Sequence, residues 1–358
     1  MSPSPPRSGH PYHMHDAIYA QPGALRLLTR GQGDTLAAAA GRIAAAPHVW
    51  LAGAGSSWHA ALVGEMLLAG VGRLGARVRA IDAAHLVEYA PEPAAAAVVA
   101  ITHRGTNGYA SAALARARGA GAPAVAITGK GGDGPDGAEH VLRTVDHEAS
   151  SCHTVSYTCA LAMLAALAAA VGHDEETARQ LDAIPDQLAM LLGQESWEEL
   201  AARFGGRRRY WIVGGGPNVA TAYEAALKLG EGAWAPSVGL GTEQFLHGGW
   251  AALEPDDLVV LIAPPGAAHA RAIDAARVAA EIGASLIALV AEDDREIAPL
   301  AAETIALPPV PELLSPMVAI VPLQLITYHL AVTTGADPDG MRGTQAAYAR
   351  ARVAAAGA

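Results

Sequence analysis

An internal duplication constrains the fold of this 358-residue chain more than any other feature. The apolar run HVWLAGAGSS ends in a glycine turn, and the second half repeats the pattern as RYWIVGGGPN; a helix-like stretch follows each run. The first glycines of the two turns, Gly53 and Gly214, are 161 positions apart, and the next apolar runs, which end at Gly105 and Gly266, keep that spacing. A third pair, PAVAITGK and SLIALVAE, is offset by 162. We therefore expect two copies of one fold.

Within each copy, apolar runs alternate with amphipathic helix patterns, which is typical of parallel α/β units. The runs AVVAI and LVVLI are apolar at every position, so they predict strands that are buried on both faces of a sheet. We predict two tandem, doubly wound, flavodoxin-like α/β domains with parallel sheets. The expected parts are an N-terminal leader (1–34), a first domain (35–172), a helical linker (173–200), a second domain (201–334) and a C-terminal tail (335–358).

The composition limits the class of partner. Hydrophobic residues make up 51% of the chain and charged residues 16%, which indicates a globular protein rather than a disordered one. The formal net charge of −11 argues against nucleic acid or an anionic membrane as the main partner. We expect a small-molecule ligand, because a local pocket can bind an anion whatever the charge of the whole protein.

The cysteines and the apolar stretches indicate a reducing compartment. Cys152 and Cys159 are the only cysteines, and nothing resembles a zinc-site spacing, so we expect buried or incidental thiols. The proton-transfer chemistry considered below needs no metal and no organic cofactor, so we expect neither. The first twelve residues are rich in proline and serine and lack the apolar core of a signal peptide. The stretch ALAMLAALAAAVG is shorter than a membrane span and predicts a core helix. We therefore expect a cytoplasmic protein without a membrane partner.

Ligands of parallel α/β sheets bind at the carboxyl ends of the strands. The first copy places Gly55, Ser56 and Ser57 there, where backbone N–H groups and hydroxyls at a helix start favour a phosphate. The alternative is a tight turn in which a serine caps the helix. A dinucleotide is less favoured, because GAGSSW lacks the third glycine of that motif. The loop THRGTN adds three polar residues to the same edge: Thr102, Arg104 and Asn107.

The stretch ALKLGEGAWAPSVGLGTEQFLHGG holds the candidates for acid–base chemistry. Lys228 and Glu231 are three positions apart at the end of a predicted helix, and Glu243 and His247 follow in an expected glycine-rich loop. Glutamate and histidine suffice to move protons near neutral pH, and a neighbouring ammonium would keep the carboxylate ionised. A surface ion pair is the simpler alternative. Glu231 and His247 can cooperate only if the loop folds back or a second copy supplies the histidine.

These stretches together resemble the sugar isomerase (SIS) domain family, in particular the isomerase half of glucosamine-6-phosphate synthases and the related deglycases. LAGAGSSWHA, EASSCHTVSYTCAL, AYEAALKLGE with GTEQFLHGG, and VPLQLITYHLAVTTGADPD carry the resemblance, which covers about 35–345. It implies that Glu231 moves a proton between sugar C1 and C2, and that His247 assists ring opening or departure of a leaving group from across a homodimer interface. Lys228 and Glu224 fall on further site positions of the same helix.

The chain also departs from the family pattern. The cysteine-dependent glutaminase domain of the synthases has no counterpart, so we expect no ammonia release from glutamine. Ala346 stands where the synthases have a Schiff-base lysine. The serine-rich phosphate loop is THRGTN, and the later loop has His153 in place of serine, followed by Thr154, with Val155 in place of lysine. An arginine in this loop can still clamp an anion.

The expected function is proton transfer on a sugar phosphate or amino-sugar derivative, with isomerisation, deamination or deglycation as the outcome. Arg104, with Ser56, Ser57 and Thr102, would hold the anionic end of the substrate. Three alternatives stay open at this point. The chain could be a catalytically silent sugar-phosphate sensor, an ammonia-dependent aminotransferase that works with a separate glutaminase, or an enzyme for an unphosphorylated substrate.

Overall fold

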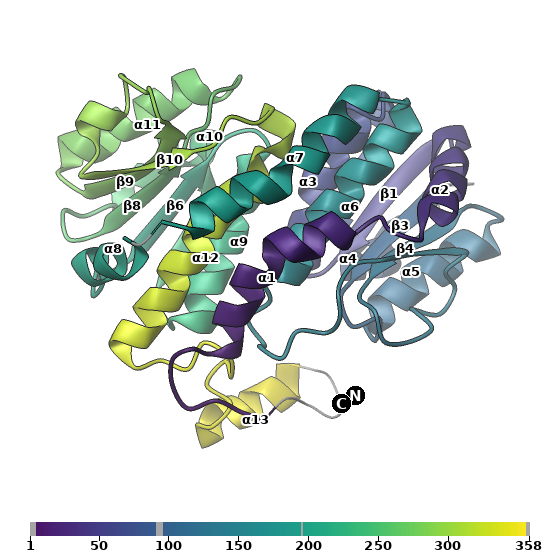
Figure 1. Cartoon of the computed structure of the whole chain (residues 1–358), viewed down its shortest axis with the longest axis horizontal. Helices are drawn as coiled ribbons and strands as arrows, with labels where there is room; N and C mark the ends of the chain where they lie inside the picture. Colours follow the sequence, from purple (N-terminus) through teal and green to yellow (C-terminus); the bar gives the residue numbers. More distant parts are fainter. Residues whose placement is uncertain (1–4, 91–95, 195, 356–358) are drawn as a thin grey trace.

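Each repeat of the sequence forms a five-stranded parallel sheet (Figure 1). The first sheet has the order β2-β1-β3-β4-β5 and the second has the order β10-β9-β8-β6-β7. The strands of the first sheet are β1 (His48–Gly53), β2 (Val78–Asp82), β3 (Ala96–Thr102), β4 (Ala124–Thr128) and β5 (His140–Arg143). Those of the second are β6 (Tyr210–Gly214), β7 (Ser237–Gly241), β8 (Leu258–Ile262), β9 (Ser285–Ala291) and β10 (Glu303–Leu307).

Counted within its own repeat, each sheet has the flavodoxin-like order 2-1-3-4-5, so the predicted fold class is confirmed. Gly53 and Gly214 close the equivalent strands β1 and β6. All residues of β3 and of β8 are buried, as their continuous apolar sequences predict. Helices cover both faces of each sheet, which this burial requires (Figure 1).

This computed structural model describes residues 5–90, 96–194 and 196–355, so the parts of the expected leader, linker and tail at 1–4, 195 and 356–358 lie outside the described residues. Its α-helices are α1 (His13–Leu27), α2 (Gly33–Ala45), α3 (Ser56–Gly70), α4 (Ala83–Glu88), α5 (Gly108–Gly119), α6 (Val155–Gly172), α7 (Glu175–Leu192), α8 (Trp197–Phe204), α9 (Asn218–Gly232), α10 (Thr242–Leu246), α11 (His269–Ile282), α12 (Ser315–Thr334) and α13 (Ala346–Ala355). Short 3-10 helices occupy η1 (Gly75–Arg77), η2 (Gly249–Ala252), η3 (Ala298–Leu300) and η4 (Glu312–Leu314).

A layer of helices lies between the two sheets and joins the repeats (Figure 1). In this layer α3 of the first repeat packs against α6 and against α9 of the second repeat, and α12 packs against α9. Their side chains belong to one hydrophobic cluster that extends from the first repeat into the second. The N-terminal helix α1 packs against α6, α7 and α12 of the same layer. Residues of α3 and α9 therefore meet at the boundary between the repeats.

The stretch after α9 differs from the sequence expectation. Instead of a glycine-rich loop, it forms the edge strand β7 and the short helix α10. Glycine is needed in β7 because a Cβ on Gly239 would lie 2.6 Å from the carbonyl oxygen of Ala222 in α9. The glycines thus let the strand pack directly on the helix, and they do not break the chain into a loop.

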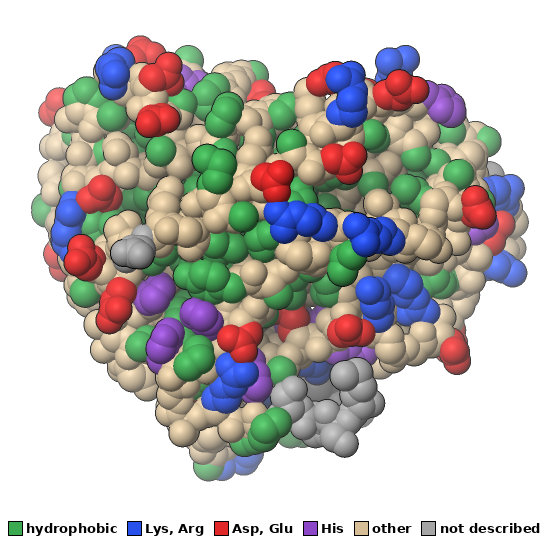
Figure 2. Space-filling model, viewed as in Figure 1, with side chains coloured by type: hydrophobic (Ala, Val, Ile, Leu, Met, Phe, Trp, Pro, Cys, Tyr) green, Lys and Arg blue, Asp and Glu red, His purple; other side chains and the backbone are tan. Residues whose placement is uncertain are grey.

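Two helices, α6 and the segment Glu312–Thr334, are long and apolar enough to cross a membrane. Both are core helices in this structure, since 89% of each apolar window is buried inside the protein. Acidic and basic side chains are interspersed over the face that Figure 2 shows. Cys152 and Cys159 are free and buried, as expected from the sequence.

Candidate active site

Helix α9 places a row of three charged side chains on one face. Glu224, Lys228 and Glu231 are spaced four and three residues apart, which brings them to the same side of the helix. The Nζ of Lys228 lies 2.5 Å from Oε2 of Glu231 and 3.4 Å from Oε1 of Glu224. Lys228 is 1% exposed and Glu224 is 0% exposed. The row is therefore buried, and the alternative of a surface ion pair is wrong.

Two side chains of the first repeat form hydrogen bonds with the carboxylate of Glu224. Ser56 Oγ donates to Glu224 Oε1 at 2.8 Å, and His59 Nδ1 donates to Glu224 Oε2 at 2.7 Å. Both donors lie on the first turn of α3, directly after the turn formed by Gly55. Burial alone would raise the pKa of Glu224, but Lys228 and the hydrogen bonds from His59 and Ser56 outweigh it and hold the pKa below its ordinary value. Glu224 is thus an ionised link between the two repeats.

Glu231 is the member of the row that reaches solvent, with 17% of its side chain exposed. Burial raises the pKa of Glu231 above its ordinary value even though Lys228 beside it favours the carboxylate. The sequence predicted the opposite direction, because it took only the ammonium into account. A raised pKa makes the carboxylate a stronger base, which suits the removal of a proton from carbon.

Lys228 remains protonated in this setting. Its burial favours the neutral amine, but the two carboxylates of Glu224 and Glu231 outweigh that effect and raise the pKa of Lys228. The three side chains carry one positive and two negative charges when all are ionised. A buried ammonium between two carboxylates is held in place electrostatically and can donate a hydrogen bond toward Glu231.

An open groove of about 500 Å³ lies beside Glu231. Its walls on the side of the second repeat include Gly230, Trp234 and Ser237, and the opposite wall is formed by Met341, Arg342 and Tyr348 of the C-terminal tail. The tail therefore folds back from the end of α12 to the end of α9. This groove is the space from which a ligand can reach the Glu231 carboxylate.

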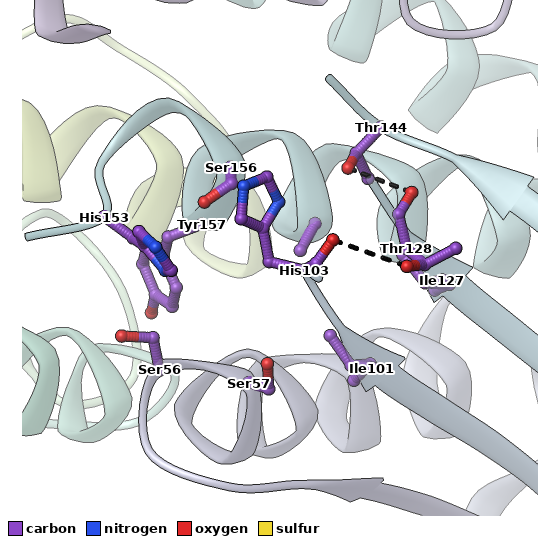
Figure 3. A pocket seen from close by; sticks show the side chains of 11 residues that line it. Ser56, Ser57, Ile101, His103, Ile127, Thr128, Thr144, His153, Ser156 and Tyr157 are labelled. Atoms are coloured by element: carbon purple, nitrogen blue, oxygen red, sulfur yellow. Dashed lines mark hydrogen bonds between the residues drawn. The ribbon is translucent and has the colours of Figure 1, made fainter. Parts of the chain in front are cut away.

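A second, small pocket lies at the carboxyl ends of the strands of the first sheet (Figure 3). Its volume is about 30 Å³, and its lining consists of Ser56, Ser57, Ile101, His103, Ile127, Thr128, Thr144, His153, Ser156, Tyr157 and Ala160. Ser56 and Ser57 at the start of α3 lie across from His103 and His153 in Figure 3. Ser56 also bonds Glu224, so the pocket and the charged row share this residue.

Three buried polar atoms around this pocket have no hydrogen-bond partner within the described part of the chain: His103 Nδ1, His153 Nε2 and the hydroxyl of Tyr157. The rings of His103 and His153 are in edge contact, with 4.9 Å between centroids. Burial, aided by nearby positive charge, lowers the pKa of each of the two imidazoles to about 4, so both are neutral at pH 7. Buried polar groups are normally satisfied, so these atoms are available to a polar ligand group.

The start of α6 is already occupied by a carboxylate of the chain itself. Glu148 accepts hydrogen bonds from the backbone N–H of Thr154 (2.9 Å) and of Ser156 (2.9 Å), and from the hydroxyls of both residues. A carboxylate at a helix N-terminus is stabilised by the helix dipole. Thr154, which the sequence placed among the ligand-binding residues, is therefore engaged by Glu148 and does not line the pocket.

The loop THRGTN contributes less than the sequence predicted. Asn107 accepts from the N–H groups of Tyr109 (2.9 Å) and Ala110 (3.2 Å), so its side chain caps α5. Thr102 is buried at the end of β3, and Arg104 is exposed next to the pocket without lining it. Only His103 from this loop reaches the pocket. The alternative of a serine cap on α3 is also wrong, since the cap residue is Gly55, with φ of 56°.

The matching edge of the second sheet is closed. Glu312 accepts a hydrogen bond from the N–H of Ala267, and a Cβ on Gly266 would lie 2.3 Å from Glu312 Cδ. A Cβ on Gly215 would lie 2.5 Å from the Cβ of Ala268. Side chains of the chain itself therefore fill the place where the first repeat has an open pocket. The two repeats therefore differ at the carboxyl ends of their strands: the first has a pocket there, and the second is filled by side chains.

Glu243 of α10 and His247, which directly follows that helix, lie on the surface, and within the described residues neither forms a hydrogen bond or an ion pair with Glu231. His247 Nε2 is 3.2 Å from Glu243 Oε2, and Glu243 also pairs with Arg271 at 2.6 Å. The side chains of His247 and Glu243 are 75% and 57% exposed. Within one chain, β7 leads from the end of α9 to α10, which packs against α11. A meeting of His247 with Glu231 therefore requires a second copy, and it stays a prediction.

The fold brings to these sites several residues that were not predicted from the sequence: His59, His103, Glu148, Tyr157 and Arg342. Two of them carried a local signal. His59 follows Ser56 by three positions at a helix start, and Glu148 opens the quoted stretch EASSCHTVSYTCAL. Among the described residues, no group of three metal-ligating side chains is suitably placed for an ion.

Residues 206–334 match the family described as SIS domain. The chain is 32% identical over 351 residues to a glutamine–fructose-6-phosphate aminotransferase (isomerizing) of Thermococcus kodakarensis, and the match covers 94% of this chain and 58% of that protein. The chain thus spans a little over half the length of this relative.

Two solved structures share the fold over nearly their whole length. The tagatose-6-phosphate ketose/aldose isomerase of Escherichia coli has a TM-score of 0.80 at 18% identity, with 95% of this chain and 98% of that chain covered. The C-terminal domain of the glucosamine-fructose-6-phosphate aminotransferase of Francisella tularensis has a TM-score of 0.80 at 16% identity, with 92% and 99% covered. At these identities the likeness establishes the common fold.

Proposed function

We propose that this chain, which carries a SIS domain in residues 206–334, is an enzyme that moves protons on the open-chain form of a sugar phosphate or amino-sugar derivative. The observation that carries the proposal is the ion pair of Lys228 and Glu231, which is 2.5 Å long, largely buried and adjacent to an open groove. Perturbed ionisable groups next to a cleft are typical of catalytic sites. The relatives support the substrate class, since their names include fructose 6-phosphate and tagatose 6-phosphate.

Glu231 acts as the base in this proposal. Its carboxylate takes the proton from the carbon next to the carbonyl or imine group and returns it to the neighbouring carbon. Lys228 stays protonated beside it, so its ammonium balances the negative charge of Glu231 and donates toward the oxygen that becomes an enediolate. Isomerisation, deamination and deglycation all share this enediol or enaminol step.

The small pocket of the first repeat holds the distal end of the substrate. Ser56 and Ser57 offer hydroxyls and helix-start N–H groups, and His103 and His153 offer neutral imidazoles with free ring nitrogens. Arg104 at the rim supplies positive charge to an anionic group. The hydrogen bond from Ser56 to Glu224 ties this pocket to the row that ends at Glu231. An extended sugar phosphate can contact both sites.

We also propose that the active enzyme is a cytoplasmic homodimer in which His247 of one copy serves Glu231 of the other. The exposure of His247 supports this arrangement, because a histidine that is 75% exposed in one chain is free to enter a partner's site. An imidazole at that point can protonate a ring oxygen or a leaving nitrogen. No observation favours the silent sensor or the aminotransferase partner over this enzyme.

Product analysis tests the proposed function. Purified protein is incubated with fructose 6-phosphate, tagatose 6-phosphate, glucosamine 6-phosphate and an amine adduct of fructose 6-phosphate, each alongside its unphosphorylated form. The proposal predicts turnover of at least one phosphorylated compound, seen as an isomer, free ammonia or a released amine. Binding of these compounds without any product would instead establish a sensor.

A further inference from the structure

We propose that Arg342 binds a carboxylate attached at the C1 end of the substrate, which makes an adduct of a sugar phosphate with an amino acid the preferred substrate class. The inference rests on the proposed function, because it takes Glu231 as the group that acts at C1 and C2. Arg342 lines the same groove as Glu231 but comes from the tail, more than a hundred residues further along the chain.

The guanidinium of Arg342 is held rigidly in the wall of this groove. Its Cζ lies 4.5 Å from the ring centroid of Trp234 and 4.5 Å from that of Tyr348. Its Nη1 donates to the hydroxyl of Tyr348. Stacking on aromatic rings fixes the plane of an arginine and leaves only its edge for hydrogen bonds. The orientation of the charge is therefore set before a ligand arrives.

The charge of Arg342 is not balanced by the protein. No carboxylate within the described ranges forms an ion pair with Arg342, and Glu231 pairs with Lys228 instead. The Nε of Arg342 is buried and has no hydrogen-bond partner in the same part of the chain. A buried donor without a partner costs free energy, so a ligand that supplies an acceptor there gains affinity.

The position of the donors favours a carboxylate. With Nη1 bound to Tyr348, the arginine edge that carries Nε and Nη2 remains, and this fork matches the two oxygens of a carboxylate. In the proposed function, the distal anion of the substrate binds in the pocket of Ser57 and His103. An anion at Arg342 is then a second one, and it lies close to C1 because Arg342 lines the groove beside Glu231. An amino acid joined through its nitrogen to C1 places its carboxylate there.

Binding measurements on a variant that cannot turn over test this proposal. Glu231→Gln protein is titrated with the C1 glycine adduct of fructose 6-phosphate and with the matching methylamine adduct, which lacks only the carboxylate. We expect the glycine adduct to bind about tenfold more tightly or better, since a charged hydrogen-bonded pair is worth roughly 1.5–3 kcal/mol. Adding Arg342→Ala should remove this preference, while Arg350→Ala, an exposed arginine of the same tail, should keep it.

Arg342→Lys separates recognition from a purely structural role of the arginine in the tail. Lysine keeps the charge but lacks the fork, so it should retain only part of the preference. Three results would overturn the proposal. The two adducts could bind with equal affinity, Arg342→Ala could weaken the binding of both equally, or neither adduct could bind. Failure of the proposed function is distinguishable, because it is seen in turnover and not in binding. In that case the wild-type protein converts none of the tested sugar phosphates, whether or not it binds the glycine adduct more tightly than the methylamine adduct.

Discussion

The Nζ of Lys228 lies 2.5 Å from Oε2 of Glu231 in an environment that leaves Lys228 only 1% exposed. A surface pair with the same spacing would contribute little, because water and salt screen it. Here Glu224 adds a second carboxylate at 3.4 Å, and Ser56 and His59 satisfy that carboxylate from the other repeat. The ion pair is therefore part of the contact between the repeats as well as the centre of the proposed chemistry.

Lys228→Ala should destabilise the protein strongly. Removing the ammonium leaves two buried carboxylates without their counter-charge, and breaking a buried pair in this way costs about 3–5 kcal/mol. Urea unfolding monitored by circular dichroism measures the loss. Lys130→Ala, at an exposed lysine, is the matched control and should stay within about 0.5 kcal/mol of wild type. A loss no larger than that of the control would show that the charged row is not a stabilising contact.

His59→Ala should impair both stability and catalysis by releasing Glu224. The hydrogen bond from His59 to a buried carboxylate is worth roughly 1.5–3 kcal/mol. As a positioning residue, His59 should affect kcat more than KM, because it acts on Lys228 and Glu231 only through Glu224. His59→Gln, which keeps a donor, should restore part of kcat. A variant with unchanged kcat would contradict the proposed link between the repeats.

Acid should destabilise the protein through the pocket of the first repeat. The pKa values of His103 and His153 are lowered to about 4 from an ordinary value of 6.5. Between these pH values the unfolded chain binds more protons than the folded one, so stability is highest above pH 6.5 and falls as the pH drops toward 4. Urea midpoints across this range should fall less for His103→Gln/His153→Gln than for wild type or for His48→Gln, an exposed control.

Mixing two inactive variants tests the shared site. Glu231→Gln and His247→Ala should each lose most of the activity as pure dimers. In a mixed dimer, one of the two sites combines an intact Glu231 with an intact His247, so an equal mixture that has exchanged subunits should regain about a quarter of wild-type activity. If both variants are folded, dimeric and able to exchange subunits, a mixture without activity would exclude a histidine supplied by the partner.

The repeated α/β fold could be predicted from the sequence because it depends on local patterns that recur at a fixed spacing. Continuous apolar strands such as β3 and β8 and the glycines that close β1 and β6 identify the two halves directly. The edge strand β7 was not predicted, because glycine has a low strand propensity. A glycine is nevertheless needed at position 239 of this strand for its close contact with α9.

The charged row was predictable because its residues lie on one helix, and Ser56 and Ser57 were predictable because they begin a helix directly after a strand. The spacing of Lys228 and Glu231 placed them together, whereas their burial depends on how α9 packs against α3 and α12. The direction of the Glu231 pKa shift could not be read from the sequence for the same reason, because desolvation is a property of the packed structure. Arg342 reaches Trp234 only through the path of the tail, for which the sequence offers no local pattern.

Exchange of deuterium from solvent into the substrate tests the central claim most directly. The substrate identified by product analysis is incubated in D₂O with wild-type protein, with Glu231→Gln, and with Glu281→Gln as an exposed control. Glu231 as the base predicts that wild type and the control introduce deuterium next to the carbonyl carbon and that Glu231→Gln, still folded and still able to bind, does so at least about a hundredfold more slowly. Exchange by Glu231→Gln at the wild-type rate would contradict the assignment of Glu231 as the proton-transferring group.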